Sequence, residues 1–286
     1  MPVAVVADST NYLPADLAAE YGIHVVSLYV RWGDELERES DMADFGDFYE
    51  RLSTAKDLPT TSQPSIGDFL AVYEPLLEAG HDIVSIHLSA GVSGTYDGAL
   101  QAKAQLEEQG HRGRIQVVDS ATAAGGFGLV AAATGAKARS GAGMNEVVAH
   151  AEAAREQLKI WFAVDTLEYL RRGGRIGAAQ AWIGGALKIK PILSIESEIL
   201  PVERVRTSGK AFERLVDYLR SRADDGADAW VVQHIRAPEA AERMVERGRE
   251  IFGTEPFFVS EVGPVIGAHT GPGLVGVGGI PRSCLR

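Results

Sequence analysis

The sequence predicts an α/β protein of two domains, the first with a parallel sheet (1–160) and the second with a mainly antiparallel sheet (161–286). In the first half, apolar β-branched runs alternate with helical patterns, which is typical of a parallel sheet covered on both faces. From about Lys159 the pattern changes to paired strands around a polar turn, which favours an antiparallel hairpin. A chain of 286 residues that is 45% hydrophobic is long enough to form both cores.

The strands of the first half end at polar loops. Val3–Ala7 has the character of a buried strand that ends at Asp8, Ser9 and Thr10. The other strands predicted are Ile23–Val30, Ile83–Leu88 and Ile115–Val118. The predicted helices are Leu13–Tyr21, Phe45–Leu52, one that contains Phe69, Tyr73 and Leu77 and starts at Ser65 with Asp68 at capping-box distance, Asp97–Gln109, and an Ala/Gly-rich helix after Ser120. This domain is expected to be Rossmann-like, with ligands at the carboxyl ends of its strands.

The second half is predicted to contain fewer strand–helix alternations. Its expected strands are Ile160–Val164, a hairpin of Ile192–Ile195 and Val202–Thr207 around Glu196–Glu198, Ala229–Ile235, and Phe257–Val262 as the last strand. Its expected helices are Ala211–Ala223 and Pro238–Phe252. The segment Gly263–Gly273 is too rich in Gly and Pro to be predicted as a helix. The boundary near residue 160 follows this change of pattern, because no linker composition marks it.

Composition excludes several classes of function. A formal net charge of −11 opposes phosphate backbones and anionic lipid, so no nucleic-acid partner is expected. Cys284 is the only cysteine, which excludes an intramolecular disulfide or a thiolate metal cluster and favours the reducing cytoplasm. The N-terminus has no export-signal pattern. Two uncharged stretches, Ser120–Ala136 and Val262–Pro281, are interrupted by Gly, Thr or Pro, so no stable membrane insertion is expected.

Three strand-end loops concentrate hydroxyl groups: Ser9 and Thr10, Thr60–Ser65, and Ser89–Tyr96. Hydroxyls and loop N–H groups donate hydrogen bonds to a small anion, and a glycine such as Gly94 lets backbone approach it closely. These loops therefore predict a site for a carboxylate or phosphate head group. The alternative is that the Ser and Thr residues are helix caps and turn formers.

Three arginines, Arg171, Arg172 and Arg175, flank the pair Gly173 and Gly174 in an acidic chain. The guanidinium fork is suited to carboxylate or phosphate. For Arg171 and Arg172 the alternative is positive charge at a helix C-terminus followed by a glycine stop. Positive charge is added to the same half by Lys188 and Lys190.

His269 lies in the segment Gly263–Gly273, whose backbone could bring the ring against a ligand head group or simply turn a corner. No second His or acid stands at ligand spacing, so no metal site is predicted. The stretch Ala123–Gly128 lacks the spacing of a dinucleotide fingerprint and of a P-loop, and no cofactor is predicted. An acyl- or phosphoryl-transfer enzyme with Ser93 as nucleophile and His269 as base stays open.

Seven motifs occur in a fixed order along the chain. They are Asp8-Ser9-Thr10, Thr61-Ser62-Gln63-Pro64-Ser65, Ser93-Gly94-Thr95-Tyr96, Asp119-Ser120, Gly173-Gly174-Arg175-Ile176, Lys190-Pro191-Ile192-Leu193 and Gly267-Ala268-His269-Thr270-Gly271-Pro272-Gly273. Taken together they resemble the DegV family, over residues 8 to 273. Each motif is weak alone, but the ordered set over nearly the whole chain is specific.

The resemblance implies a bacterial cytoplasmic protein of two α/β domains that binds a long-chain fatty acid and is not itself an enzyme. The acyl chain would lie in an apolar tunnel, largely in the second domain, with its carboxylate at the domain interface. Family members that partner a fatty acid kinase present the carboxylate for phosphorylation by ATP, giving an acyl phosphate for phospholipid synthesis. The kinase catalytic subunit performs that chemistry.

The resemblance also assigns residues, on matching positions of this sequence. The ligand-binding set would be Thr61, Ser62, Ser93, Gly94, Thr95, Arg175, His269 and Thr270. Thr61 and Ser93 would bond to the carboxylate, Arg175 and His269 would belong to the surrounding polar network, and Arg172 is a further candidate. Two departures from the family pattern, Val92 in place of Leu and Ala121–Ala124 after Ser120, predict an altered lining. A regulatory module for another amphiphile is a third hypothesis.

Overall fold

The computed structural model describes residues 1–183 and 189–286, and Lys188 of the predicted basic group lies outside the described residues. The first half contains a parallel four-stranded sheet (sheet A) in the order β2-β1-β6-β7. Its strands are β1 (Val3–Asp8), β2 (Ile23–Val26), β6 (Asp82–His87) and β7 (Ile115–Asp119). β1 and β6 are buried almost along their whole length, as expected for strands covered on both faces.

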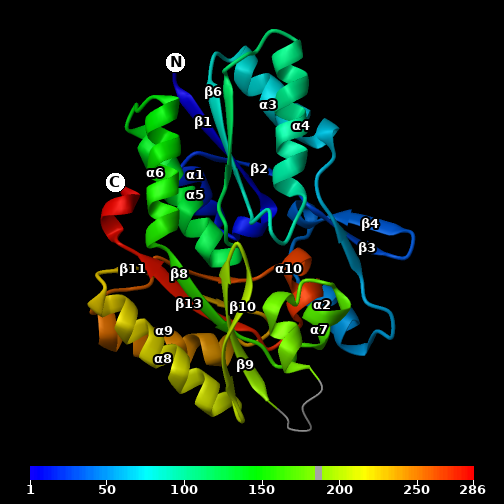
Figure 1. Ribbon diagram of the computed structural model, residues 1–286, viewed down its shortest axis with the longest axis vertical. Coiled ribbons are helices and arrows are strands. Elements are labelled where there is room, and N and C mark those ends of the chain that lie inside the picture. Colours follow the sequence, from blue (N-terminus) through cyan, green and yellow to red (C-terminus); the bar gives the residue numbers. More distant parts are fainter. Residues whose placement is uncertain (184–188) are drawn as a thin grey trace.

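Helices cover both faces of sheet A (Figure 1). They are α1 (Ala15–Glu20), α3 (Ile66–Glu78), α4 (Thr95–Glu108), α5 (Ala124–Arg139) and α6 (Met144–Gln157). The helices α3 and α4 pack on one face, where Val6 and Ile83 contact Phe69 and Tyr73. The helices α5 and α6 pack on the other face. Ser65 and Asp68 form the predicted capping box at the start of α3.

A small antiparallel sheet (sheet B) stands beside sheet A, in the order β4-β3-β5. It consists of β3 (Tyr29–Trp32), β4 (Glu35–Arg38) and β5 (Thr60–Ser62), with α2 (Gly46–Thr54) between β4 and β5. The prediction of a single strand over Ile23–Val30 is therefore wrong. Leu28 N–H donates to the hydroxyl of Ser9 at 3.2 Å, so the chain leaves sheet A there and enters sheet B.

The second half contains a six-stranded sheet (sheet C) in the order β10-β9-β8-β13-β11-β12, antiparallel except for the pair β11 and β12. Its strands are β8 (Lys159–Ala163), β9 (Lys190–Glu196), β10 (Glu198–Val205), β11 (Ala229–His234), β12 (Phe258–Glu261) and β13 (Val275–Ile280). The helices α8 (Ser208–Asp224) and α9 (Pro238–Phe252) cover one face, and α5 contacts β11 and β13. The predicted hairpin of β9 and β10 is present, and the predicted fold class is confirmed.

Two predictions in the C-terminal segment are wrong. Phe257–Val262 is not the last strand, because β13 follows and lies centrally between β8 and β11. The strand β13 contains glycines at positions where a side chain would not fit. A Cβ on Gly278, for example, would lie 2.6 Å from the carbonyl oxygen of Lys159. The segment predicted to be non-helical contains α10 (Pro264–Thr270), which starts with Pro at a position that needs no N–H donor. Gly267 gives α10 close contact with the ring of Tyr49.

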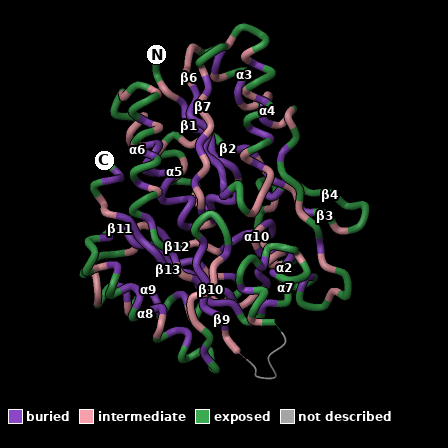
Figure 2. The backbone as a smooth tube through the Cα atoms, in the orientation of Figure 1, coloured by how far each residue is buried: buried purple, intermediate pink, exposed green. Residues whose placement is uncertain are grey.

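Buried residues run through the centre of both sheets (Figure 2). The strands of sheet A precede residue 120 and those of sheet C follow residue 158. The helix α5 contacts strands of both sheets, which joins the two halves through one core. The domain boundary at residue 160 stays a prediction. Five short segments complete the described fold: the helix α7 (Glu168–Arg172) and the 3₁₀ turns Ser9–Asn11, Glu39–Asp41, Gly177–Trp182 and Arg282–Leu285.

Candidate functional site

A cavity of about 400 Å³ lies between the two halves of the chain. That volume is within the range of ~300–1,000 Å³ typical of small-molecule sites. Its apolar lining consists of Leu28, Leu88, Val92, Ala123, Ala124, Ile160, Phe162, Leu170, Ile195, Ile199, Val262, Val265, Ile266 and Leu274. Most of these residues come from the second half. The cavity therefore has the walls of a site for an apolar ligand.

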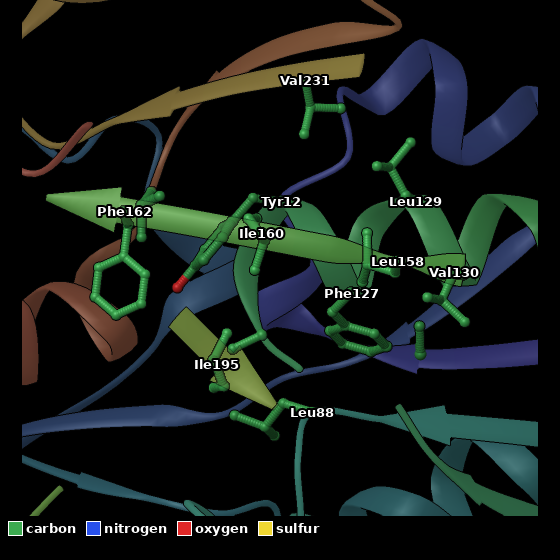
Figure 3. Packing of buried hydrophobic residues seen from close by; sticks show 14 of the residues in the cluster. Tyr12, Leu88, Phe127, Leu129, Val130, Leu158, Ile160, Phe162, Ile195 and Val231 are labelled. Carbon is green, nitrogen blue, oxygen red and sulfur yellow. The ribbon is translucent and has the colours of Figure 1, made fainter. Parts of the chain in front are cut away.

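Sheet C supplies one wall through the alternation of its side chains. Ile160 and Phe162 lie two residues apart on β8, so both point to the cavity face, whereas Trp161 points to the opposite face and stacks on Tyr218. Figure 3 shows Ile160 and Phe162 on the same strand, with Ile195 and Leu88 among the buried residues near it. A regular strand pattern thus explains why this wall is continuous and apolar.

The polar lining gathers at segments that are far apart in the sequence. It consists of Thr61, Ser62, Gln63, Ser93, Gly94, Arg175, Gln233, His269 and Thr270. Seven of the eight residues assigned from the sequence are in this set. The eighth, Thr95, does not line the cavity; its buried side chain lies behind Ser93, with the two hydroxyl oxygens 2.9 Å apart. Their role as ligand-binding residues stays a prediction.

Thr61 and His269 form the closest pair in this polar lining. Thr61 Oγ1 and His269 Nε2 lie 2.8 Å apart, joining β5 to the end of α10. Burial, and secondarily the charge of Arg175, lower the pKa of His269 to about 4. The ring is therefore neutral near pH 7. Its Nδ1 is buried against Gly173 and has no hydrogen-bond partner among the described residues.

The loop before α4 holds Ser93 and Gly94 at the cavity. The Ser93 hydroxyl also accepts the N–H of Thr95 at 3.3 Å, so it serves the turn as well as facing the cavity. A Cβ at Gly94 would collide with the amide oxygen of Gln63, so a larger residue there would have to displace the Gln63 side chain.

The three arginines differ in position. Arg175 lines the cavity and is exposed, and its guanidinium donates to the carbonyl oxygens of Val92 at 3.2 Å and Gly173 at 2.8 Å. Arg171 pairs with Glu168 on the surface of α7, and Arg172 donates to the carbonyl of Lys56 at 3.2 Å. Only Arg175 of the three thus lies at the cavity.

The sequence analysis missed two polar lining residues. Gln63 lies in a loop that was predicted to be polar, but was not assigned. Gln233 is buried on β11, and its side chain bonds to Gly125 N–H and to the hydroxyl of Ser260. Its only signal is a single amide in the mainly apolar strand Ala229–Ile235. The two predicted departures, Val92 and Ala121–Ala124, do contribute to the lining through Val92, Ala123 and Ala124.

The described residues contain no group of three or more His, Cys, Asp or Glu side chains arranged to hold a metal ion. Within the same part of the chain, we find no helix with the length and apolar character needed to cross a membrane.

Comparisons with known proteins agree with this geometry. The family model described as "Uncharacterised protein, DegV family" matches residues 2–282. A DegV domain-containing protein of Streptomyces coelicolor is 42% identical over 278 residues, which cover 96% of this chain and 97% of that protein. Protein DegV of Bacillus subtilis is 35% identical over 280 residues, covering 97% of this chain and 98% of the relative.

Two solved structures carry the same fold. The structure described as "Fatty Acid Binding of a DegV family Protein from Thermus thermophilus" superposes with a TM-score of 0.87 at 32% identity and covers 98% of this chain and 100% of its own. The structure of DegV, described as a fatty acid binding protein from Bacillus subtilis, has a TM-score of 0.86 at 35% identity and covers 97% and 98%. The extent of the sequence match and these superpositions establish that the chain belongs to the DegV family.

Proposed function

We propose that this protein binds one long-chain fatty acid, with the acyl chain in the apolar cavity and the carboxylate at Thr61 and Ser93. The observation that carries the proposal is one cavity whose lining combines a large apolar part with Arg175, His269 and the hydroxyls of Thr61, Ser62, Ser93 and Thr270. Solved relatives from Thermus thermophilus and Bacillus subtilis are described as fatty acid binding proteins, which supports the same ligand class here.

The apolar wall supplies the affinity. Each methylene that leaves water contributes about 0.8 kcal/mol, so a dozen contribute about 10 kcal/mol before the cost of ordering the ligand. A surplus of about 8 kcal/mol corresponds to micromolar binding. An acyl chain can therefore be held without any strong contact at its carboxylate.

The polar end satisfies the carboxylate without a large local charge. A neutral imidazole carries one N–H, and with the proton on Nε2 His269 donates to Thr61 Oγ1, which leaves the Thr61 hydroxyl free to donate into the cavity. Arg175 adds one cation at the exposed side. Such donors stabilise a partly buried carboxylate, which would otherwise be protonated or expelled.

We further propose that the protein is a cytoplasmic carrier that presents this carboxylate to a separate fatty acid kinase catalytic subunit, and has no catalytic activity of its own. The exposed position of Arg175 beside Ser93 supports access from outside. Loaded protein, mixed with ATP and such a kinase subunit, should yield an acyl phosphate that hydroxylamine traps as the hydroxamate. Equal yield from free fatty acid in the absence of this protein would contradict presentation.

The Ser93–His269 enzyme is disfavoured by the contacts of both residues. His269 Nε2 is engaged by Thr61, its Nδ1 has no acid partner among the described residues, and a pKa of about 4 makes it a weak base near neutral pH. Ser93 Oγ contacts Thr95 instead. A covalent adduct with a serine-reactive phosphonate that is lost in Ser93→Ala would reverse this conclusion.

Mass spectrometry of the protein, purified without added lipid and sprayed under native conditions, tests the proposed ligand directly. A bound mass that matches one fatty acid per chain is expected. Protein that is repeatedly empty and also gives no heat on titration with palmitic acid would exclude fatty acid binding. A rise in melting temperature with a different amphiphile alone would support the third hypothesis.

A further inference from the structure

The short helix α10 carries two of the polar lining residues, and its own sequence does little to hold it in place. It has seven residues, with Pro264 at its start and Gly267 in its interior. Helices this short are unstable in isolation, so contacts at the two ends must fix its position. His269 makes the contact at the C-terminal end, to Thr61.

A buried carboxylate makes the contact at the N-terminal end. Glu39 is 3% exposed, and its Oε1 accepts the N–H of Val265 at 2.8 Å and the hydroxyl of Tyr12 at 2.8 Å. Its Oε2 accepts the hydroxyl of Ser9 at 2.6 Å. A carboxylate at this end also complements the positive end of the helix dipole. Three donors, two from the segment Ser9–Tyr12 and one from the start of α10, thus converge on one side chain.

Two tyrosines complete this anchor. Tyr12 accepts the N–H of Ile266 at 3.4 Å while it donates to Glu39, so the first free N–H groups of α10 are bonded by residues of the first half. Tyr49 donates to the carbonyl oxygen of Val262 at 2.6 Å. A Cβ on Gly263 would lie 2.6 Å from Glu39 Oε1, so the backbone here is as close to the anchor as glycine allows.

We infer that Glu39 is a positioning residue for the head-group site: it holds the N-terminal end of α10 and thereby sets where His269 meets Thr61. Glu39 does not line the cavity. The Val265 N–H that it accepts lies one helical turn before His269 on the same face, so a shift of that end moves the imidazole directly. The inference rests on the proposed function, since it assigns a role in that site.

The electrostatic surroundings of Glu39 support its role as a positioning residue. Burial raises its pKa to about 7, against the lowering effect of the bonds from Ser9, Val265 and Tyr12, and the charge of Asp8 raises it further. Tyr49 is the other titratable group that interacts with it. Burial of a carboxyl group costs free energy, and its presence here is consistent with the use of its hydrogen bonds to hold α10.

The test is the variant Glu39→Gln, with palmitic acid and hexadecan-1-ol as paired ligands in titration calorimetry. Glutamine keeps the shape but cannot accept all three donors. We expect the dissociation constant for palmitic acid to rise about tenfold and that for the alcohol to change less than twofold. The matched control is Glu37→Gln, at an exposed position of β4, which should change neither. An equal loss for both ligands, or no loss, would overturn the positioning role.

A double variant sharpens the test, and the substitution Tyr12→Phe keeps the inference testable if glutamine disturbs folding. In a Thr61→Ala background, Glu39→Gln should cost less than twofold, because the contact that it positions is already gone. If the rise in dissociation constant of the double variant equals the product of the rises in the two single variants, the inference is contradicted. Tyr12→Phe removes one donor from the same anchor and should weaken palmitic acid binding about threefold with little effect on the alcohol; a loss for both ligands would count against it.

The proposed function and this inference fail in different ways. Wild-type protein that does not bind palmitic acid would overturn both. Wild-type protein that binds it normally, with a Glu39→Gln variant that behaves identically, would overturn only the positioning role.

Discussion

Two histidines with hydroxyl partners occupy contrasting places in the molecule. In sheet A, His87 contacts Asp8 through Nδ1 at 3.1 Å and Ser85 through Nε2 at 2.7 Å, and all three residues are fully buried. At the cavity, His269 contacts the hydroxyl of Thr61 and has no acid partner among the described residues. The order acid, imidazole, hydroxyl thus exists where no substrate can enter, and the accessible histidine lacks the acid.

This contrast separates structural from binding chemistry. A hydrolase needs the oriented acid, the base and access at one place. Here Asp8 also accepts the N–H groups of Thr10 and Leu88, and the hydroxyl of Tyr73 donates to Ser85, so the buried group joins strand ends rather than facing a ligand. Among the described residues, the cavity lining offers hydroxyl, amide and imidazole groups beside Arg175, and no Asp or Glu. The comparison therefore supports the binding role proposed for the cavity.

Removal of the buried imidazole should have the largest effect, and it should fall on stability alone. His87→Leu leaves the carboxylate of Asp8 and the hydroxyl of Ser85 without their shared partner, which should destabilise folding by about 3–5 kcal/mol. Thermal unfolding should show a fall in Tm on the order of 10 °C. The control is His24→Leu at an exposed position. If folded His87→Leu protein loses affinity for fatty acid, the assignment of a purely structural role to His87 is wrong.

At the cavity the expected pattern is reversed, with loss of binding and little change in stability. Thr61→Ala with Ser93→Ala removes two hydroxyl donors from the proposed carboxylate site and should weaken palmitic acid binding about 100-fold, from the ~1.5–3 kcal/mol of hydrogen bonds to charged groups. Titration calorimetry gives the change. Ser53→Ala with Thr54→Ala deletes the same atoms on the exposed side of α2 as a control. Unchanged affinity would show that the carboxylate lies elsewhere.

Acid should affect the cavity histidine through its lowered pKa. Burial favours neutral His269 in the folded state, with a pKa of about 4 against an ordinary 6.5, so its contribution to stability is present above pH 6.5 and is lost as pH falls toward 4. Wild-type protein should lose up to about 2 kcal/mol relative to His269→Gln over that range, since 1 pKa unit corresponds to about 1.4 kcal/mol and the ring borders an open cavity.

Urea unfolding of both proteins at pH 7 and pH 4.5 measures this difference. Glu39 acts in the opposite direction, because a pKa raised to about 7 gives stability that is lost as pH rises from about 4.5 to 7. The paired comparison cancels that contribution, which both proteins share. Parallel curves for the two proteins would contradict the assignment of a neutral, buried imidazole.

Much of the site was predictable because parallel strands bring their carboxyl ends to one edge. The hydroxyl loops after β1 and β6 follow from strand patterns alone, and seven of the eight residues assigned by family resemblance, Thr61 and Ser93 among them, do line one cavity. The apolar run Ile160–Val164 predicted a strand there, although not which of its faces would border a cavity. Local pattern was sufficient wherever an element is regular and its polar residues follow it directly.

The remainder depends on contacts that no local pattern encodes. The segment with α10 and β13 was misread because Gly267 and Gly278 are required by close packing against Tyr49 and Lys159, and not by turns. Glu39 stands in an otherwise polar, exposed segment, so nothing in the sequence marks it as buried. The partners of His87 are equally hidden, since Asp8 lies 79 positions away.

The smallest effect should come from the one cation that we place at the cavity. Arg175→Met keeps the apolar stem and removes the charge. We expect the association rate of palmitate to fall about threefold at low ionic strength. In about 0.5 M salt the rates of variant and wild type should become equal, because screening then removes attraction over more than a few ångströms. Stopped-flow fluorescence with a labelled fatty acid measures this rate. Arg171→Met is the matched control, because Arg171 pairs with Glu168 on α7 away from the cavity. If the association rate is still reduced about threefold in high salt, Arg175 acts instead through its hydrogen bonds to the carbonyl oxygens of Val92 and Gly173, which stabilise this side of the cavity.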